Sequence, residues 1–136
     1  MTLGEYVGML LAADAGVAAR AGERVYTEVL PQAPTFPAVV FTEVYGDEDN
    51  DLSGPTGVRT RRLQIDSWAD TRAEATALAL AVRAALDGHD GGASGLVVQD
   101  ASLFSERWEF DPGVNAADGA YRTSQDYEVT TSGVES

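Results

Sequence analysis

The sequence predicts an α+β domain in which a mainly antiparallel sheet carries two helices packed on one face. The patterns along the chain run helix, strands, helix, strands, an order typical of α+β domains. Neighbouring strand patterns are joined by polar, turn-rich segments, which favours antiparallel hairpins. The chain has 136 residues, of which 44% are hydrophobic, enough for one domain over 1–136 with a sizeable core.

The first segment, Leu3–Ala21, is predicted to be helical. Its apolar stripe follows the i, i+3, i+4 spacing of one helix face and comprises Val7, Leu10 and Leu11. Asp14 is suited to cap a second short helical piece over 15–20, which Gly22 would stop. We expect the stripe to pack on the sheet.

Two strands are predicted next, over Arg24–Leu30 and Ala38–Tyr45. Between them, three prolines in 31–37 predict a connection, because proline cannot donate to a ladder. The polar, acidic stretch 46–55 is expected to be an exposed loop between two hairpin strands.

The middle of the chain predicts a strand over 58–68 that runs into a helix over 71–87. Period-two alternation places Leu63 and Ile65 toward the core and Trp68 on the opposite face. Thr71 with Glu74 fits a capping box, and Asp70 is a rival cap. One helix face holds the apolar residues Ala75, Leu78, Ala79, Val82 and Leu86.

The last part predicts a turn over 89–94 and a strand over 96–103 that continues over 104–110 after a bend. A second polar loop is expected over 111–119, followed by the final strand over 120–131.

Charge and composition restrict the function. The net charge is −13, with 22 acidic residues against 9 basic ones, all of them arginine. This acidity argues against wrapping a nucleic acid, because phosphate binding needs a basic face. There is no cysteine, no stretch long enough to span a bilayer and no basic leader, so a cytoplasmic origin without membrane contact is expected.

No pattern predicts catalysis, a cofactor or a metal site. Asp47, Asp49 and Asp51 begin like a calcium loop, but Leu52 and Val58 stand where glycine and a bidentate glutamate are needed. The one histidine, His89, lies in a glycine-rich turn and is expected to be exposed and idle. Nucleotide-binding motifs are missing from the sequence.

The one basic cluster consists of Arg59, Arg61 and Arg62, with Arg59 and Arg61 on one strand face. It could pair with nearby acids across the hairpin, such as those of 47–51, or form a charge-complementary contact between subunits. Trp68 and Trp108 could be core residues or interface anchors; the face of Trp68 favours an interface.

Several loose motifs carry a resemblance to a known family. They are Arg24-Val25-Tyr26 near the first strand, a proline before the second, the strand Gln64-Ile65-Asp66-Ser67-Trp68, and the alanine-rich helix after it. By these motifs the chain resembles the small tail-completion or tail-terminator proteins of long-tailed bacteriophages of the siphovirus type, also found in gene-transfer particles.

The resemblance implies a structural virion protein without enzymatic activity. Such proteins form a ring, usually a hexamer, at the head-proximal end of the tail, and assemble from the host cytoplasm. The implied partners are other copies of the chain, the tail tube protein and the head-completion protein, with DNA passing through the channel. The interface candidates are Asp47, Glu48, Asp49, Asp51, Arg59, Arg61, Arg62, Trp68, Asp111 and Asp118. The alternatives are an acidic DNA-mimic inhibitor and a head-side connector protein.

Overall fold

A computed structural model describes residues 1–51, 54–113 and 119–133, with only the backbone at 45, 47–51 and 54–56. The helices are α1 (Leu3–Ala13), α2 (Ala15–Ala21) and α3 (Arg72–Leu86). The strands are β1 (Val25–Thr27), β2 (Ala38–Asp51), β3 (Gly54–Ala69), β4 (Gly91–Ala93), β5 (Leu96–Asp111) and β6 (Ala120–Gly133).

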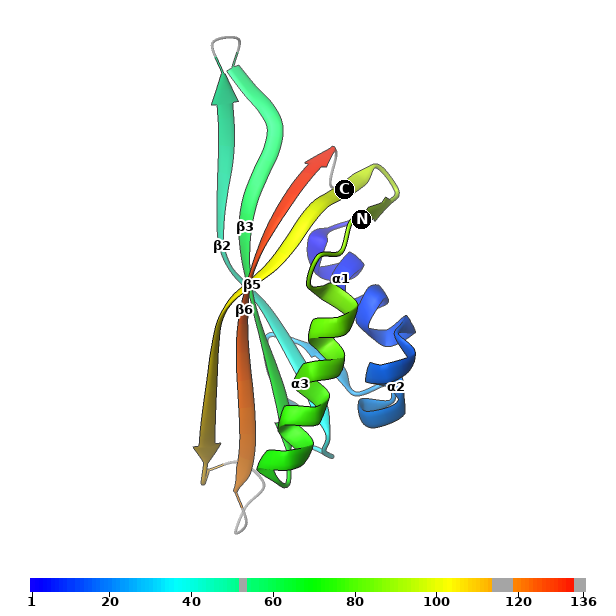
Figure 1. Cartoon of the computed structure of the whole chain (residues 1–136), viewed down its shortest axis with the longest axis vertical. Coiled ribbons are helices and arrows are strands. Elements are labelled where there is room, and N and C mark those ends of the chain that lie inside the picture. Colours follow the sequence, from blue (N-terminus) through cyan, green and yellow to red (C-terminus); the bar gives the residue numbers. More distant parts are fainter. Residues whose placement is uncertain (52–53, 114–118, 134–136) are drawn as a thin grey trace.

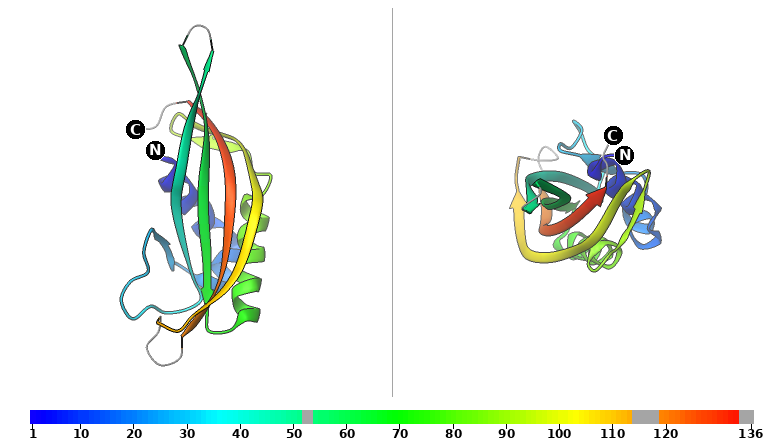
Figure 2. Two further views of the ribbon diagram at one scale, coloured as in Figure 1. Left: turned by 90° about the vertical axis from the view of Figure 1, so that its left-hand side faces the viewer. Right: turned by 90° about the horizontal axis from the view of Figure 1, so that it is seen from above.

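The strands form one six-stranded sheet in the order β1-β2-β3-β6-β5-β4. All neighbours pair antiparallel except β1 and β2, which are parallel. The sheet is strongly curled, as the view from above in Figure 2 shows. The expected mainly antiparallel α+β class fits this arrangement, although the first helical region is divided into α1 and α2.

All three helices lie on one face of the sheet (Figure 1). The core between them contains Leu63, Ile65 and Tyr127, each with no exposed surface. The helices contribute the buried residues Leu3, Val7, Leu11, Val17, Leu78, Val82 and Leu86. The predicted apolar faces of α1 and α3 and the inward orientation of Leu63 and Ile65 are therefore confirmed.

The helix boundaries follow from capping. The Asp14 carboxylate accepts a hydrogen bond from Val17 N at 3.0 Å and so begins α2, which Gly22 ends with a positive φ of 58°. Thr71 Oγ1 accepts from Glu74 N at 3.1 Å, so Thr71 and not Asp70 is the cap of α3. Both predicted caps are confirmed, because short polar side chains satisfy the free N–H groups of the first turn.

The long hairpin of β2 and β3 extends past β6, whose pairs with β3 stop at Arg59, and we call the outer part of the hairpin, residues 46–51 and 54–61, the arm (Figure 1). The prediction of a loop over 46–55 was wrong for the described residues there. Glu48 pairs with Arg59 and Asp51 with Gly54, so the ladder continues to the tip. The acidic residues of this stretch predict exposure to solvent, but they do not distinguish a loop from a strand. A strand with both faces exposed can have the same polar composition as a loop.

Three smaller boundaries differ from the predictions. The first strand covers only Val25–Thr27, because Glu28 takes a positive φ of 71° and leaves the ladder. The expected turn over 89–94 contains the short strand β4, which pairs with the start of β5. The expected bend in β5 is a register shift between Leu103 and Ser105, and the strand continues through it to Asp111.

Trp68 lies in a second apolar cluster on the sheet face opposite the helices. Its side chain is 6% exposed and clusters with Val40 and Ala120. The connection that follows β1 covers it, with the Phe36 ring stacked at 6.2 Å between centroids. The face of Trp68 was predicted correctly, and of its two predicted roles the structure favours the core residue over the interface anchor, because the proline-rich connection folds back over it.

Candidate assembly interface

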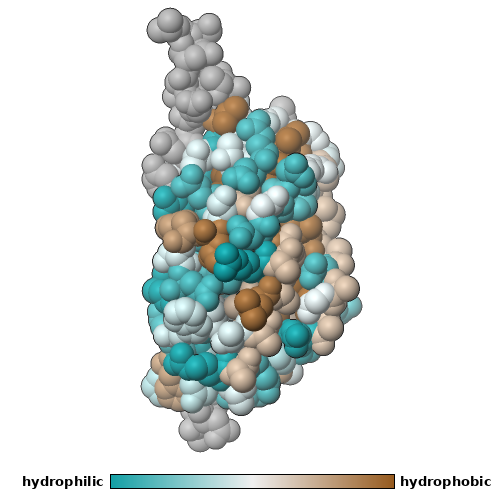
Figure 3. Space-filling model, in the orientation of Figure 1, coloured by the Kyte–Doolittle hydropathy of each residue, from teal (hydrophilic) through white to brown (hydrophobic). Residues whose placement is uncertain are grey.

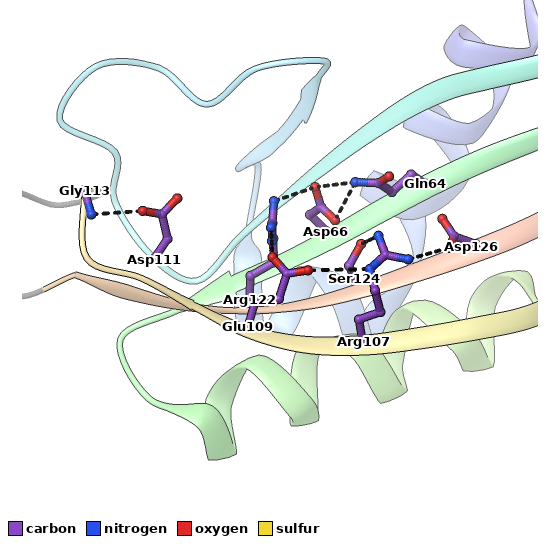
Figure 4. Close-up of polar contacts among 9 residues, drawn as sticks. All are labelled: Gln64, Asp66, Arg107, Glu109, Asp111, Gly113, Arg122, Ser124 and Asp126. Atoms are coloured by element: carbon purple, nitrogen blue, oxygen red, sulfur yellow. Dashed lines mark hydrogen bonds and ion pairs between the residues drawn. The ribbon is translucent and has the colours of Figure 1, made fainter.

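The sheet face without helices carries a network of charged side chains from β3, β5 and β6 (Figure 4). Arg122 on β6 binds Glu109 on β5 and lies 3.7 Å from the Asp66 carboxylate on β3. Gln64 donates to both oxygens of Asp66 at 3.2 Å. This chain of contacts ties three neighbouring strands together across the sheet.

Arg107 extends the network on β5. Its guanidinium donates to Asp126 at 2.7 Å and to Ser124 Oγ at 3.0 Å, both on β6. The hydrogen bond with Asp126 is the main reason why the pKa of Arg107 is raised. The network is thus a regular set of cross-strand pairs that neutralise one another.

The same network gives a pH dependence. The hydrogen bond from Arg122, followed by its charge, holds the pKa of Glu109 below its ordinary value of 4.5. Because the pKa of Glu109 is lower in the folded chain than in the unfolded chain, its contribution to the stability of the fold is complete above the pKa of the unfolded chain. This contribution is lost as the pH falls through the pKa of the folded chain. We expect the melting temperature to fall between about pH 5 and about pH 3, and Glu109→Gln to make this fall shallower. An unchanged slope in the variant, measured by circular dichroism, would contradict the role of Glu109.

Above the network, Arg62 joins the same face. It donates to Glu128 on β6 at 3.2 Å, and its guanidinium carbon lies 3.9 Å from the centroid of the Phe104 ring. Such stacking suits the planar guanidinium. Val44 lies beside Arg62 and Phe104 at a shallow depression of the surface.

Arg61 lies on the helix side, at the base of the arm. It is 3% exposed and donates to both carboxylate oxygens of Glu43 on β2, at 2.6 and 2.9 Å. Of the two interpretations of the arginine cluster, pairing across the hairpin is therefore correct for Arg61. Its partner is Glu43 rather than an acid of 47–51, because the register places Glu43 close to it across β2 and β3.

The other predicted interface residues are placed as follows. Asp47, Glu48, Asp49 and Asp51 belong to the arm, and their side chains lie outside the described part of the chain. Arg59 is on β3 opposite Glu48. Asp111 ends β5, where its carboxylate accepts from Gly113 N at 2.9 Å, and Asp118 lies outside the described residues. Among those whose side chains the structure describes, Arg59 and Asp111 lie near opposite ends of the sheet and form no common cluster with Trp68.

His89 is half-buried rather than exposed. Its Nε2 lies 2.7 Å from the hydroxyl of Tyr6, and burial raises the pKa of that tyrosine. The pair joins α1 to the segment before β4. Over the described residues, no group of three or more His, Cys, Asp or Glu side chains is arranged to hold a metal ion.

Both sides of the sheet end in strands that are unpaired over part of their length, a feature not predicted from the sequence. In the described chain, β1 covers β2 only at Val39–Phe41, and β4 covers β5 only at Leu96–Val98. We call the stretch 42–46 of β2 the first edge and the stretch 105–111 of β5 the second edge. Exposed apolar side chains lie at these edges, namely Val44, Trp108 and Phe110, and Phe104 stands directly before the second edge.

The rest of the surface is mixed. Viewed as in Figure 1, apolar side chains form small separate spots among polar ones (Figure 3). Among the described helices, none is long and apolar enough to cross a membrane. Unpaired strands with aromatic side chains are unusual on a protein that works alone, because exposed edges invite pairing with another chain.

These features are typical of small α+β proteins that act by assembly. Comparison with known proteins identifies the family. The profile of the family described as tail completion protein gp17 matches residues 6–132, so the chain belongs to this family. A chain in the virion of a native gene transfer agent (GTA) particle has the same fold, with 25% identity and a TM-score of 0.70. The match covers 93% of this chain and 92% of the other; no curated protein sequence matches.

The predicted resemblance is therefore confirmed. The protein is a structural component of a phage-type or gene-transfer particle, associated with the tail.

Proposed function

We propose that this protein forms a ring, most simply a hexamer, that ends the tail tube at its head-proximal end and joins it to the head-completion protein. The observation that carries the proposal is the match of nearly the whole chain to a tail completion family and to a chain of a gene transfer agent virion.

A ring needs two different contact surfaces on each subunit, because every copy meets one neighbour on each side. The first and second edges lie on opposite sides of the sheet and differ in sequence. They therefore suit head-to-tail contacts better than a two-fold dimer.

Charge supports passage of DNA through such a ring. On the helix-free face, the described arginines are each paired with carboxylates: Arg62 with Glu128, Arg107 with Asp126, and Arg122 with Glu109. Paired guanidinium groups attract phosphate less than free ones do, so DNA would slide without sticking. A ring whose channel wall carries net positive charge would contradict this part of the proposal.

The arm and the 111–119 segment are the surfaces we assign to contacts with the tube or the head connector. The arm can be shortened by replacing 48–59 with Asn-Gly, so that the paired residues Asp47 and Thr60 flank a tight turn and only the terminal Arg59–Thr131 pair of β3 and β6 is lost. We expect a folded protein that still closes into rings on tails but no longer joins heads to tails.

Electron microscopy of particles produced with this variant gives the readout. Full heads separated from ring-capped tails support the proposal, whereas normal joining contradicts the role of the arm. Tails of uncontrolled length in cells that lack the protein altogether support the terminator role. Tails of normal length with unsealed heads would instead indicate a head-side connector. A protein absent from purified particles would remove the proposal.

A further inference from the structure

Within the part of the chain that the structure describes, the backbone of the second edge has hydrogen-bonding groups without a partner, and the register gives their positions. Leu103 N donates to the Asp87 carboxylate at 3.0 Å, and the Ala101 carbonyl accepts from Gly88 N at 2.6 Å, so both residues face away from β6. Along a strand, the N–H and C=O groups of successive residues point alternately to one neighbouring strand and to the other. The register shift after Leu103 inserts one residue, so the residues that point away from β6 are even-numbered after it instead of odd-numbered. The residues whose N–H and C=O groups point away from β6 are then Glu106, Trp108 and Phe110.

The same reasoning applies to the first edge. Val39 N donates to the Arg24 carbonyl, and the Phe41 carbonyl accepts from Glu28 N, so Val39 and Phe41 face away from β3. Alternation gives Glu43 next and, after the register shift that follows it, Gly46. Both edges thus present free donors and acceptors at every second ladder position.

Strand direction allows the two edges to pair. Since β2, β3, β6 and β5 are successively antiparallel, β2 and β5 run in opposite directions. The first edge of one copy placed beside the second edge of another, in the same orientation, would continue the antiparallel order. The side chains of the outward residues on both edges lie on the helix side of the sheet, so the two faces would also be continuous.

The two edges lie at different heights, and this offset has the size that a closed barrel needs. Glu43 is level with Leu103 through the pairs Glu43–Leu63, Leu63–Tyr127 and Tyr127–Leu103. Trp108 is four ladder positions further along β5 and Phe110 six. At about 3.3 Å per position and about 4.8 Å per strand over the four-strand repeat, pairing Glu43 with either residue tilts the strands by about 35–45°. Barrel strands tilt by about 35–45°.

The direction of the offset selects which face lines the hole. Barrel strands tilt in a right-handed sense, so a viewer outside sees each copy on the right displaced upward along the strands. Seen from the helix-free face with the arm upward, the order from left to right is β2, β3, β6, β5 (Figure 2). Seen from the helix side this order is reversed, so the copy on the right places its second edge beside the first edge of the copy on the left. Within one copy the second edge is lower than the first, and the upward displacement of the right-hand copy brings the two edges level. With the helix-free face outside, the same displacement would move the two edges further apart in height.

We propose that copies of this chain join by pairing the first edge, 42–46, with the second edge, 105–111, of the next copy, with the helices outside and the helix-free face toward the hole. This inference rests on the ring of the proposed function. It places the exposed side chains of Val44, Trp108 and Phe110 at the contact between copies. Burial of such side chains supplies the apolar part of the association.

A proline at 108 tests the backbone pairing. The N–H of Trp108 faces away from β6, so Trp108→Pro leaves the β5–β6 ladder intact while removing a donor from the contact. Trp108→Val is the matched control, because it removes the indole but keeps the N–H. We expect both variants to fold with similar circular dichroism, and the proline variant to lose at least tenfold more of its incorporation into tails than the valine variant. Equal incorporation would overturn the pairing.

Cysteine cross-linking tests the register and covers the case in which both variants fail. The chain has no native cysteine, so the background is zero. Val44→Cys is combined with Arg107→Cys for the register Glu43–Trp108, or with Glu109→Cys for the register Glu43–Phe110. The control combines Val44→Cys with Val97→Cys, which is also exposed but lies in the part of β5 covered by β4.

On tails treated with a short bis-maleimide linker, we expect one of the two test pairs to give a ladder of linked copies and the control to give none. Rings visible by electron microscopy without linkage of either test pair, or with equal linkage of the control, overturn the edge pairing alone. Tails that carry no ring overturn the proposed function as well.

Discussion

Replacing Trp68 with alanine is expected to lower the free energy of unfolding by about 3–5 kcal/mol, the usual cost of removing a buried indole. The side chain is 6% exposed and lies between the sheet and the connection that follows β1. Its removal opens a cavity that the stacked Phe36 ring cannot fill without moving the connection. Urea unfolding followed by circular dichroism measures the effect.

Trp108→Ala is the matched control, since it makes the same chemical change on a side chain that is 50% exposed. We expect the free energy of unfolding of the isolated subunit to change by less than about 1 kcal/mol there. Similar losses at the two tryptophans would contradict the assignment of Trp68 to a second apolar cluster. A stable Trp68→Ala protein that fails to assemble would restore the interface role predicted from the sequence.

Trp68 also illustrates how far a sequence pattern reaches. Period-two alternation identified its sheet face correctly, because side-chain direction along a strand is a local property. Whether that face is covered depends on the path of the 28–37 connection, which is set by contacts distant in sequence. Leu30 and Phe36 could have signalled this path, because large apolar residues in a proline-rich connection need a surface to pack on, although Val29 beside them stays exposed.

Helices were predicted more accurately than strands for a related reason. The caps Asp14 and Thr71 and the apolar face of α3 are local features of single segments, and all are confirmed. The arm was mistaken for a loop because a strand far from the core needs no apolar alternation. Beyond the end of β6, its ladder depends on the partner strand alone, as the Asn50–Pro55 and Asp51–Gly54 pairs show.

The candidate interface could be predicted only in part. Single residues were selected by charge or size, and several of the described ones proved to be paired or buried: Arg61 and Arg62 bind carboxylates, and Trp68 is buried. The edges are a different kind of feature, defined by where β1 and β4 stop along their neighbours. Strand ends are poorly determined by sequence, so an unpaired stretch of a long strand becomes visible only in the folded sheet.

Neutralising Glu43 is expected to be the second most damaging change, at about 2–3 kcal/mol, because hydrogen bonds to charged groups contribute about 1.5–3 kcal/mol. Glu43→Gln removes the charge and one acceptor oxygen from a guanidinium that is 3% exposed. The buried cation then loses part of its compensation, and its desolvation is no longer offset. Arg61→Met removes the cation as well, so the double variant should be more stable than the sum of the two single losses indicates.

Glu128→Gln provides the comparison at an exposed pair. Its partner Arg62 has 39% of its side chain exposed, and Glu128 itself 45%, so we expect a loss of about 0–1 kcal/mol that disappears in high salt. The Glu43 effect should persist better in high salt, because Arg61 is buried and Glu43 is one-third exposed, so this pair is screened less. If Glu43→Gln were neutral, or if salt abolished its effect, Arg61 would be solvated at the base of the arm. In that case the Arg61–Glu43 pair would not be what fixes the position of the arm relative to the rest of the sheet, next to the first edge.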